Sequence, residues 1–91
     1  MIVKFFATYR DITKTKEISV PAPGTVWDLA DFLIEKYGAE MKNLLYNDAG
    51  DDFGKNAIII INGQNIQHIK GKLTPLSEKD LVTIFPAVAG G

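Results

Sequence analysis

The most informative run of residues in this 91-residue chain is its last one, Leu81-Val82-Thr83-Ile84-Phe85-Pro86-Ala87-Val88-Ala89-Gly90-Gly91. The apolar, β-branched and aromatic residues from Leu81 to Phe85 are typical of a β-strand. Pro86 has no N–H to offer a sheet and restricts the residue before it, so we expect the strand to lose its pairing there. The run therefore predicts a strand followed by a flexible tail, residues 86–91.

The tail ends in two glycines, and this ending has a chemical interpretation. Without side chains, Gly90 and Gly91 can pass through a channel too narrow for a Cβ atom. Val88 and Ala89 before them offer little to bury, and residues 86–91 reach roughly 20 Å when extended at about 3.3–3.6 Å each. The group delivered is the α-carboxylate of Gly91, which becomes reactive when another enzyme activates it. The alternative is a frayed chain end without a function.

The composition restricts the class of protein. With 91 residues, 46% of them hydrophobic, we expect one domain, residues 1–91. The absence of cysteine excludes disulfides, thiolate metal sites and thiol nucleophiles. A formal net charge of −1 argues against nucleic-acid or anionic-membrane partners. The longest apolar run, residues 57–61, is too short to span a bilayer, and strand-like sequence starts at Met1, so we expect no signal peptide and a cytoplasmic location.

The rest of the chain divides into short strands around one clear helix. Thr25 is a good N-cap with Asp28 three residues later, and apolar residues then recur at helical spacing as far as Tyr37. Gly38 stands where a helix-ending glycine belongs. We therefore expect strands at 2–7, 16–20, 57–61, 64–67 and 81–85, a helix at 26–37, a helical turn at 41–45, a polar turn at 9–15 and a solvated loop at 46–56.

One long helix can cover only one face of a sheet, so this order predicts a two-layer α+β fold with a mixed sheet and one open face. Lys4 and Thr83 would be costly beneath the helix, so their side of the first and last strands is expected to be the open one. Phe6 and Phe85 share that side. Two phenylalanines there, with Pro86 beside them, predict a partner-binding patch. The alternative is a covering loop or ordinary scattered apolar surface.

Other chemistry-bearing residues predict no site of their own. His68 is the single histidine, and no cysteine or second histidine completes a metal site, so we expect no metal. The aspartates of residues 48–52 lack the glutamate that closes a calcium loop. Trp27 is expected to pack against Pro21 or Pro23 rather than to form a cofactor platform.

Motifs spread over the whole chain point to a known family. They are Phe5-Phe6-Ala7, the helix begun by Thr25, Asn62-Gly63, Thr74-Pro75-Leu76 and, most specifically, residues 80–91. This pattern resembles the MoaD-like sulfur carriers, the small subunits of molybdopterin synthase within the ubiquitin-like MoaD/ThiS group.

The resemblance implies a β-grasp fold whose first and last strands are parallel and adjacent at the sheet centre. It implies that an E1-like enzyme uses ATP to adenylate Gly91, and that sulfur replaces AMP to give a thiocarboxylate. The large subunit of molybdopterin synthase then accepts the tail and moves the sulfur into a pterin precursor. Phe6 and Phe85 match positions at the family's partner interface. The chain itself would bind no cofactor and would be a non-catalytic, sulfur-donating subunit.

The chain departs from the family pattern at three places, one of which is the polar segment 14–17. Pro86-Ala87 stands where the family usually has Pro-Pro, which gives a looser tail, and residues 77–80 replace the commoner turn ending in Gly-Asp. Other pathways use the same activated glycine, namely protein modification through Gly91, thiamine-type sulfur transfer and tungsten-cofactor assembly. The sequence leaves these alternatives open.

Overall fold

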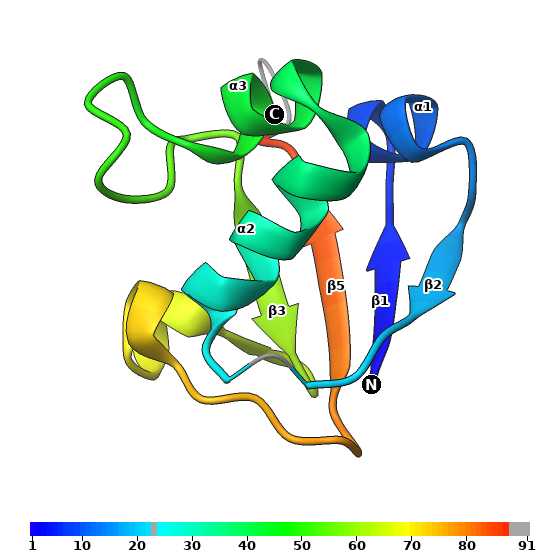
Figure 1. Cartoon of the computed structure of the whole chain (residues 1–91). Helices are drawn as coiled ribbons and strands as arrows, with labels where there is room; N and C mark the ends of the chain where they lie inside the picture. Colours follow the sequence, from blue (N-terminus) through cyan, green and yellow to red (C-terminus); the bar gives the residue numbers. More distant parts are fainter. Residues whose placement is uncertain (23, 88–91) are drawn as a thin grey trace.

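The computed structural model describes residues 1–22 and 24–87, and its centre is a mixed sheet (Figure 1). Within these residues the strands are β1 (Ile2–Phe5), β2 (Glu17–Ser19), β3 (Ile58–Ile61), β4 (Gln64–Asn65) and β5 (Leu81–Phe85). The helices are α1 (Thr8–Thr13), α2 (Val26–Tyr37) and α3 (Ala39–Leu45), with short 3₁₀ turns η1 (Ile66–His68) and η2 (Gly71–Leu73). The order and type of these elements confirm the expected α+β fold.

The sheet has the strand order β2-β1-β5-β3-β4. Strands β1 and β5 are parallel, with Val3 opposite Val82 and Lys4 opposite Thr83, and the other pairs are antiparallel. The first and last strands of the chain therefore lie side by side, with β5 in the middle of the sheet, as Figure 1 shows. This arrangement confirms the expectation that the family resemblance gave for the two strands.

Helix α2 lies across one face of the sheet, and its sequence explains both of its ends (Figure 1). The Thr25 hydroxyl accepts a hydrogen bond from the N–H of Asp28 at 3.3 Å, and the Asp28 carboxylate accepts from the N–H of Thr25 at 2.9 Å. This reciprocal capping box satisfies two N–H groups that a helix start leaves free. Gly38 ends the helix with φ 86°, a backbone angle that favours glycine. The helix predicted at 26–37 is confirmed at both ends.

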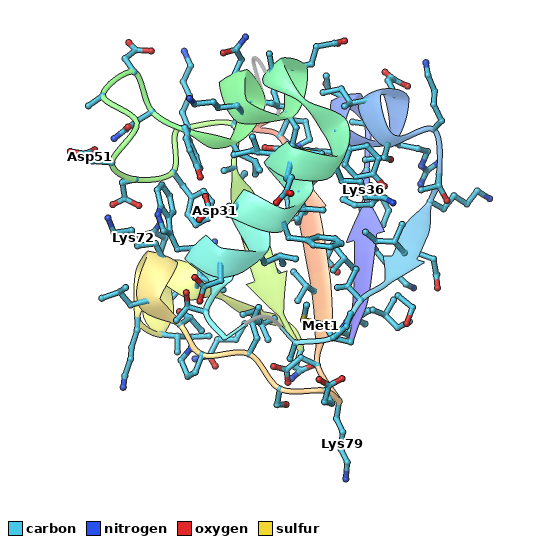
Figure 2. All side chains as sticks on the ribbon, viewed as in Figure 1. Met1, Asp31, Lys36, Asp51, Lys72 and Lys79 are labelled. Carbon is cyan, nitrogen blue, oxygen red and sulfur yellow. The ribbon has the colours of Figure 1, made fainter. Side chains whose placement is uncertain are left out.

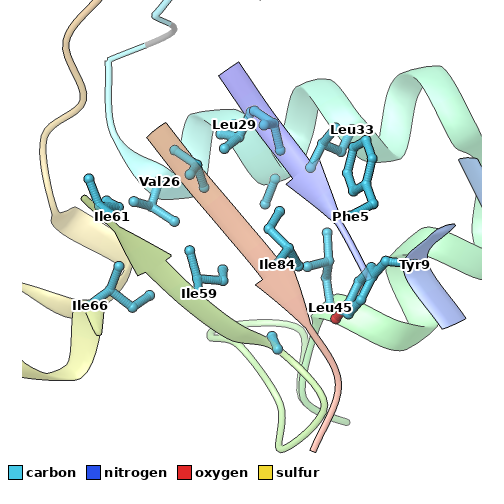
Figure 3. Packing of buried hydrophobic residues seen from close by; sticks show 14 of the residues in the cluster. Phe5, Tyr9, Val26, Leu29, Leu33, Leu45, Ile59, Ile61, Ile66 and Ile84 are labelled. Atoms are coloured by element: carbon cyan, nitrogen blue, oxygen red, sulfur yellow. The ribbon is translucent and has the colours of Figure 1, made fainter. Parts of the chain in front are cut away.

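The core forms where α2 and α3 meet the covered face of the sheet (Figure 3). Phe5 and Ile84, which pair across β1 and β5, are 0% and 1% exposed and face Leu33 of α2, itself 0% exposed. Lys4 and Thr83, at the alternate positions of the same strands, are only half-buried. The burial pattern therefore confirms which side of β1 and β5 is covered.

The polar turn expected at residues 9–15 is wrong, because Thr8–Thr13 form helix α1. Strand β1 also stops at Phe5 rather than at Ala7, which turns the chain with φ 52°. Tyr9 and Thr13 lie four residues apart, on one side of the helix, and are buried. Of the polar residues between them, Arg10 is half-buried and Asp11 is exposed. A six-residue helix is too short to be identified by apolar periodicity, and the polar composition of these residues indicated a turn instead.

Trp27 packs against residues of the loop that follows α3. Its ring stacks on Tyr46 at 4.5 Å between ring centroids and meets Phe53 edge-on at 5.1 Å. The ammonium of Lys72 lies 4.9 Å from the Trp27 ring centroid, and Figure 2 shows Lys72 on the flank of the molecule that also carries Asp51. Pro21 is exposed, and Pro23 lies outside the described residues. Trp27 therefore fastens the loop after α3 to the start of α2.

Candidate functional site

An apolar hollow of about 560 Å³ lies where β5 ends, on the open face of the sheet. It is lined by Phe6, Ala7, Thr83, Phe85, Pro86 and Ala87. Phe6 is 41% exposed, and Phe85 and Pro86 are half-buried. The structure thus brings the three residues predicted to bind a partner into one site.

The backbone holds Phe6 beside the last strand although β1 has already ended. The N–H of Phe6 donates to the carbonyl of Ile84 at 3.1 Å, which continues the pairing of β1 with β5 by one bond. The carbonyl of Phe6 accepts from the N–H of Tyr9 at 3.1 Å, and this bond holds the start of α1 against the strand end. The guanidinium of Arg10 lies 5.5 Å from the Phe6 ring centroid. The ring is therefore fixed from both sides and presented at the surface.

The strand register extends the apolar surface beyond the hollow. Ile58 of β3 pairs with Phe85, and Ile60 pairs with Thr83. Directly paired residues share a face of a sheet, so Ile58 and Ile60, both half-buried, lie on the open face. Leu81, 39% exposed, lies two residues before Thr83 on β5 and so shares the same face. We call Phe6, Ile58, Ile60, Leu81 and Phe85 the open-face patch.

The sequence singled out only Phe6 and Phe85 of this patch. Ile58 and Ile60 belong to an uninterrupted apolar run, in which alternation gives no sign of which side faces the core. The register with β5 supplies that information, because it places them opposite residues of known side. Single apolar residues are common on surfaces, whereas several of them on one face of a sheet make that face a candidate interaction site.

The base of the predicted tail lies at the edge of the same site. Pro86 and Ala87 follow directly on β5 and line the hollow. The predicted tail residues Val88, Ala89 and Gly90, together with the predicted reactive residue Gly91, lie outside the described residues. The hollow therefore lies next to the point where the chain leaves the sheet.

The described lining of the hollow is almost entirely apolar. Among the described residues that line it, none has an acidic or basic side chain, so these residues offer neither a general acid nor a general base. Within residues 1–22 and 24–87, no group of three histidine, aspartate or glutamate side chains could hold a metal ion, and His68 is exposed at the end of η1. The loop aspartates instead serve local turns, as where Asp51 accepts from the amide of Asn47 at 2.9 Å.

The turn before β5 fixes the strand that carries the tail. The Asp80 carboxylate accepts from the N–H of Ser77 at 2.8 Å and from the side-chain amide of Asn62 at 2.9 Å. The hydrogen bond from the Ser77 backbone is the main cause that lowers the pKa of Asp80. Asn62 also accepts from the N–H of Leu81 at 2.9 Å. The hairpin after β3 and the turn into β5 are thus tied together.

These features define a class. A mixed sheet with parallel first and last strands, one long helix across one face and an apolar open face leading into a C-terminal tail is a ubiquitin-like β-grasp fold. The chain belongs to the ThiS family, whose family model matches residues 3–91. Among the described residues, none forms a helix long and apolar enough to cross a membrane.

Known proteins similar to this chain share its length and its fold. Small archaeal modifier protein 3 of Haloferax volcanii is 31% identical over 91 residues, which cover 98% of this chain and 96% of the relative. The solution structure of small archaeal modifier protein 1 from Methanosarcina acetivorans has a TM-score of 0.80 at 32% identity and covers 99% of this chain and 94% of its own. The similarity therefore extends over almost the whole of this chain and of each relative.

Two more distant structures show the same fold. The BexX/CysO complex of Amycolatopsis orientalis matches with a TM-score of 0.83 at 23% identity, over 99% of this chain and 98% of the matched chain. A molybdopterin converting factor subunit 1 described as putative, from Pyrococcus furiosus, has a TM-score of 0.70 at 23% identity, over 96% of this chain and 95% of its own. The first of these comes from the structure of a protein complex, and at 23% identity both likenesses concern the fold alone.

Proposed function

We propose that this chain is a sulfur carrier whose reactive group is the α-carboxylate of Gly91. In this proposal an E1-like enzyme binds ATP and joins the carboxylate to AMP, with release of pyrophosphate. The product is a mixed anhydride, whose acyl carbon is a far better electrophile than that of a carboxylate. A sulfur donor attacks this carbon, the bond to AMP breaks, and Gly91 carries a thiocarboxylate. The chain itself binds no cofactor in this scheme.

The observation that supports the proposal best is the open-face patch at the base of the tail. A carrier must dock its body before its tail can enter an active site, because docking raises the effective concentration of the tail end. Phe85 and Pro86 join the patch to the tail directly. The family model matches the chain as far as residue 91, and so includes the two glycines. The proposed chemistry requires two features of the carrier, a rigid docking surface and a tether.

The destination we propose for the sulfur is a pterin precursor. The large subunit of a molybdopterin synthase would accept the tail, and the thiocarboxylate sulfur would become part of the dithiolene of a molybdenum or tungsten cofactor. The support is the sequence pattern, above all residues 80–91, which resembles the small subunits of that synthase. We place this chemistry in the cytoplasm.

A second candidate function is protein modification. It is favoured by the 31% identity to a relative that is named as a small archaeal modifier protein. In this case the amine of a lysine on another protein attacks the activated Gly91 and forms an isopeptide bond. Both functions need the same adenylated glycine, and they differ in the nucleophile that follows.

Intact-mass spectrometry separates these functions. The chain is incubated with the E1-like adenylating enzyme of the same organism, ATP and a sulfide source, and replacement of one oxygen by sulfur is expected. A chain without Gly91 is the control and should stay unchanged. An unmodified wild-type mass with an enzyme shown to be active would reject the carrier proposal. Isopeptide conjugates through Gly91, recovered with a tagged chain, would favour the modifier.

A further inference from the structure

Ala7 holds a backbone conformation that alanine rarely adopts. Its angles are φ 52° and ψ −124°, between the end of β1 and the start of α1. Lys14 also has a positive φ, but with φ 63° and ψ 19° it lies in the ordinary left-handed region at a helix end. The ψ of Ala7 is outside that region, in a part of conformational space that only glycine enters freely. Ala7 is therefore a strained residue.

Hydrogen bonds on both sides of Ala7 hold its backbone in this strained conformation. The N–H of Phe6 donates to the carbonyl of Ile84, and the carbonyl of Phe6 accepts from Tyr9, both at 3.1 Å. The carbonyl of Ala7 itself accepts from the N–H of Asp11 at 3.1 Å. These bonds fix the turn whatever residue stands at position 7. A glycine would make the same turn without strain, so the methyl group of Ala7 needs another explanation.

The methyl group contributes nothing to the core, because Ala7 is exposed. Ala7 instead lines the apolar hollow, together with Phe6 and Phe85. A methyl group at such a place gains contacts only when something fills the hollow. The strain therefore lowers the stability of the free chain, and the compensating contact is absent until a partner binds.

We propose that Ala7 is a specificity residue of the docking site, and that its methyl group forms one wall of a hollow that receives an apolar side chain of the partner enzyme. This inference rests on the proposed function, which supplies the partner. The occupant is aliphatic or aromatic, because the described residues that line the hollow carry no charged side chain and only one polar side-chain group, the Thr83 hydroxyl. A charged group placed there would lose its water without gaining a partner. The hollow is also continuous with the open-face patch.

Three variants test the role of Ala7. Ala7→Gly removes the strain and the methyl group together. Lys14→Gly is the matched control, since it also replaces a positive-φ residue by glycine but lies outside the hollow. Ala7→Ser keeps the strain and the Cβ atom but adds a hydroxyl. Each variant is compared with the wild type by its Tm and by its affinity for the E1-like adenylating enzyme of the same organism, measured by calorimetry.

We expect both glycine variants to melt higher, by about 4 °C or more, because relief of strain exceeds the added freedom of the unfolded chain. Only Ala7→Gly among them should bind more weakly, by about fourfold, which is the effect of one buried methyl group. Ala7→Ser should keep the wild-type Tm and also bind more weakly.

Other results would overturn the inference. Unchanged affinity of Ala7→Gly, with a wild type that binds, would show that the methyl group has no role in docking, and the proposed function would stand. A wild type that fails to bind an active enzyme would remove the proposed function and this inference with it. A dimer of the free chain that Ala7→Gly dissociates, seen by sedimentation, would assign the hollow to a second copy of the chain instead.

Discussion

The hydroxyl of Tyr9 donates a hydrogen bond to the backbone carbonyl of Asn56, 47 positions away in the sequence, at 2.5 Å. The carbonyl of Leu44 lies 3.2 Å from the same hydroxyl. The side chain of Tyr9 is 0% exposed and packs with the core residues shown in Figure 3. One residue of α1 thus holds the end of α3 and the start of β3 together.

Replacing Tyr9 by phenylalanine should destabilise the protein although the ring stays. The substitution leaves the part-buried carbonyl of Asn56 without its donor, and an unsatisfied buried group costs about 1–3 kcal/mol. We expect a loss of this size in urea denaturation. Tyr37→Phe is the control, because the part of the chain that the structure describes offers its hydroxyl no acceptor, and it should change stability by less than about 0.5 kcal/mol. Equal losses in both variants would contradict the role of the Tyr9 hydroxyl.

The Tyr46–Asp31 pair predicts a pH dependence at the alkaline end. The hydroxyl of Tyr46 donates to Asp31 at 2.8 Å, and burial, this bond and the charge of Asp31 raise the pKa of Tyr46 to about 12. A pKa raised above that of the unfolded chain stabilises the fold below the unfolded pKa of 10.0, and this contribution is lost as the pH rises towards 12. Burial raises the pKa of Tyr9 in the same direction.

Asp31→Asn tests this dependence. The variant removes the charge of Asp31, so the pKa of Tyr46 should fall towards its ordinary value, and less stability should be lost between pH 10 and 12. The phenolate absorbance gives the pKa directly, with Tyr46→Phe as the reference that removes this residue from the titration. A phenolate titration identical in wild type and Asp31→Asn would show that Asp31 does not contribute to the raised pKa of Tyr46 and would leave burial as its cause.

The helix α2 and the sides of β1 and β5 could be predicted because independent signals agreed. For α2, a capping pair at Thr25 and Asp28, apolar spacing and a terminal glycine all indicated the same bounds. For β1 and β5, Lys4 and Thr83 identified the open side, since a charge or a hydroxyl beneath the helix would be costly. Local sequence was sufficient in these places.

The remaining parts depend on contacts between residues that lie far apart in the sequence. Tyr9 looked like part of a polar turn, and only its bond to Asn56 explains why it is buried. Trp27 meets Tyr46 and Phe53 because the loop after α3 folds back on α2, which no local pattern encodes. The positive φ of Ala7 is equally hidden, since nothing in an alanine indicates it.

The capping box of α2 supports a direct stability test. Thr25→Ala removes the hydroxyl that accepts from the N–H of Asp28, and loss of an N-cap costs about 0.5–2 kcal/mol. We expect the urea midpoint to fall with an unchanged slope, since the surface exposed on unfolding stays the same. Ser19→Ala in the edge strand β2 is exposed and should have little effect. A Thr25→Ala protein as stable as wild type would mean that the cap is dispensable.

Removal of Gly90 and Gly91 should separate activation from folding. The shortened chain should keep the wild-type Tm, because Phe85, Ile84 and the rest of β5 remain. It should no longer be adenylated, measured as pyrophosphate release by the E1-like enzyme. If the shortened chain were still activated at the wild-type rate, the proposed role of the terminal carboxylate would be wrong.

The open-face patch is tested by a pair of equivalent substitutions, Phe85→Asp and Phe32→Asp. Phe85 is half-buried on the open face, whereas Phe32 is 38% exposed on α2, in the layer on the other side of the sheet. A fully buried phenylalanine would cost about 3–5 kcal/mol on truncation, so a half-buried one should leave the protein folded. The main loss should be in partner affinity, because a central aromatic residue of an interface contributes about 2 kcal/mol or more, roughly thirtyfold.

The measurement combines the Tm of each variant with its affinity for the E1-like enzyme and, separately, for the large synthase subunit. We expect Phe85→Asp to stay folded and to lose binding, and Phe32→Asp to stay folded and to bind like the wild type. Loss of the melting transition in Phe85→Asp would show that this residue belongs to the core. Equal binding losses in both variants would mean that added negative charge, rather than the open-face patch, weakens the complex. Wild-type binding by a folded Phe85→Asp protein would place the docking surface elsewhere on the molecule.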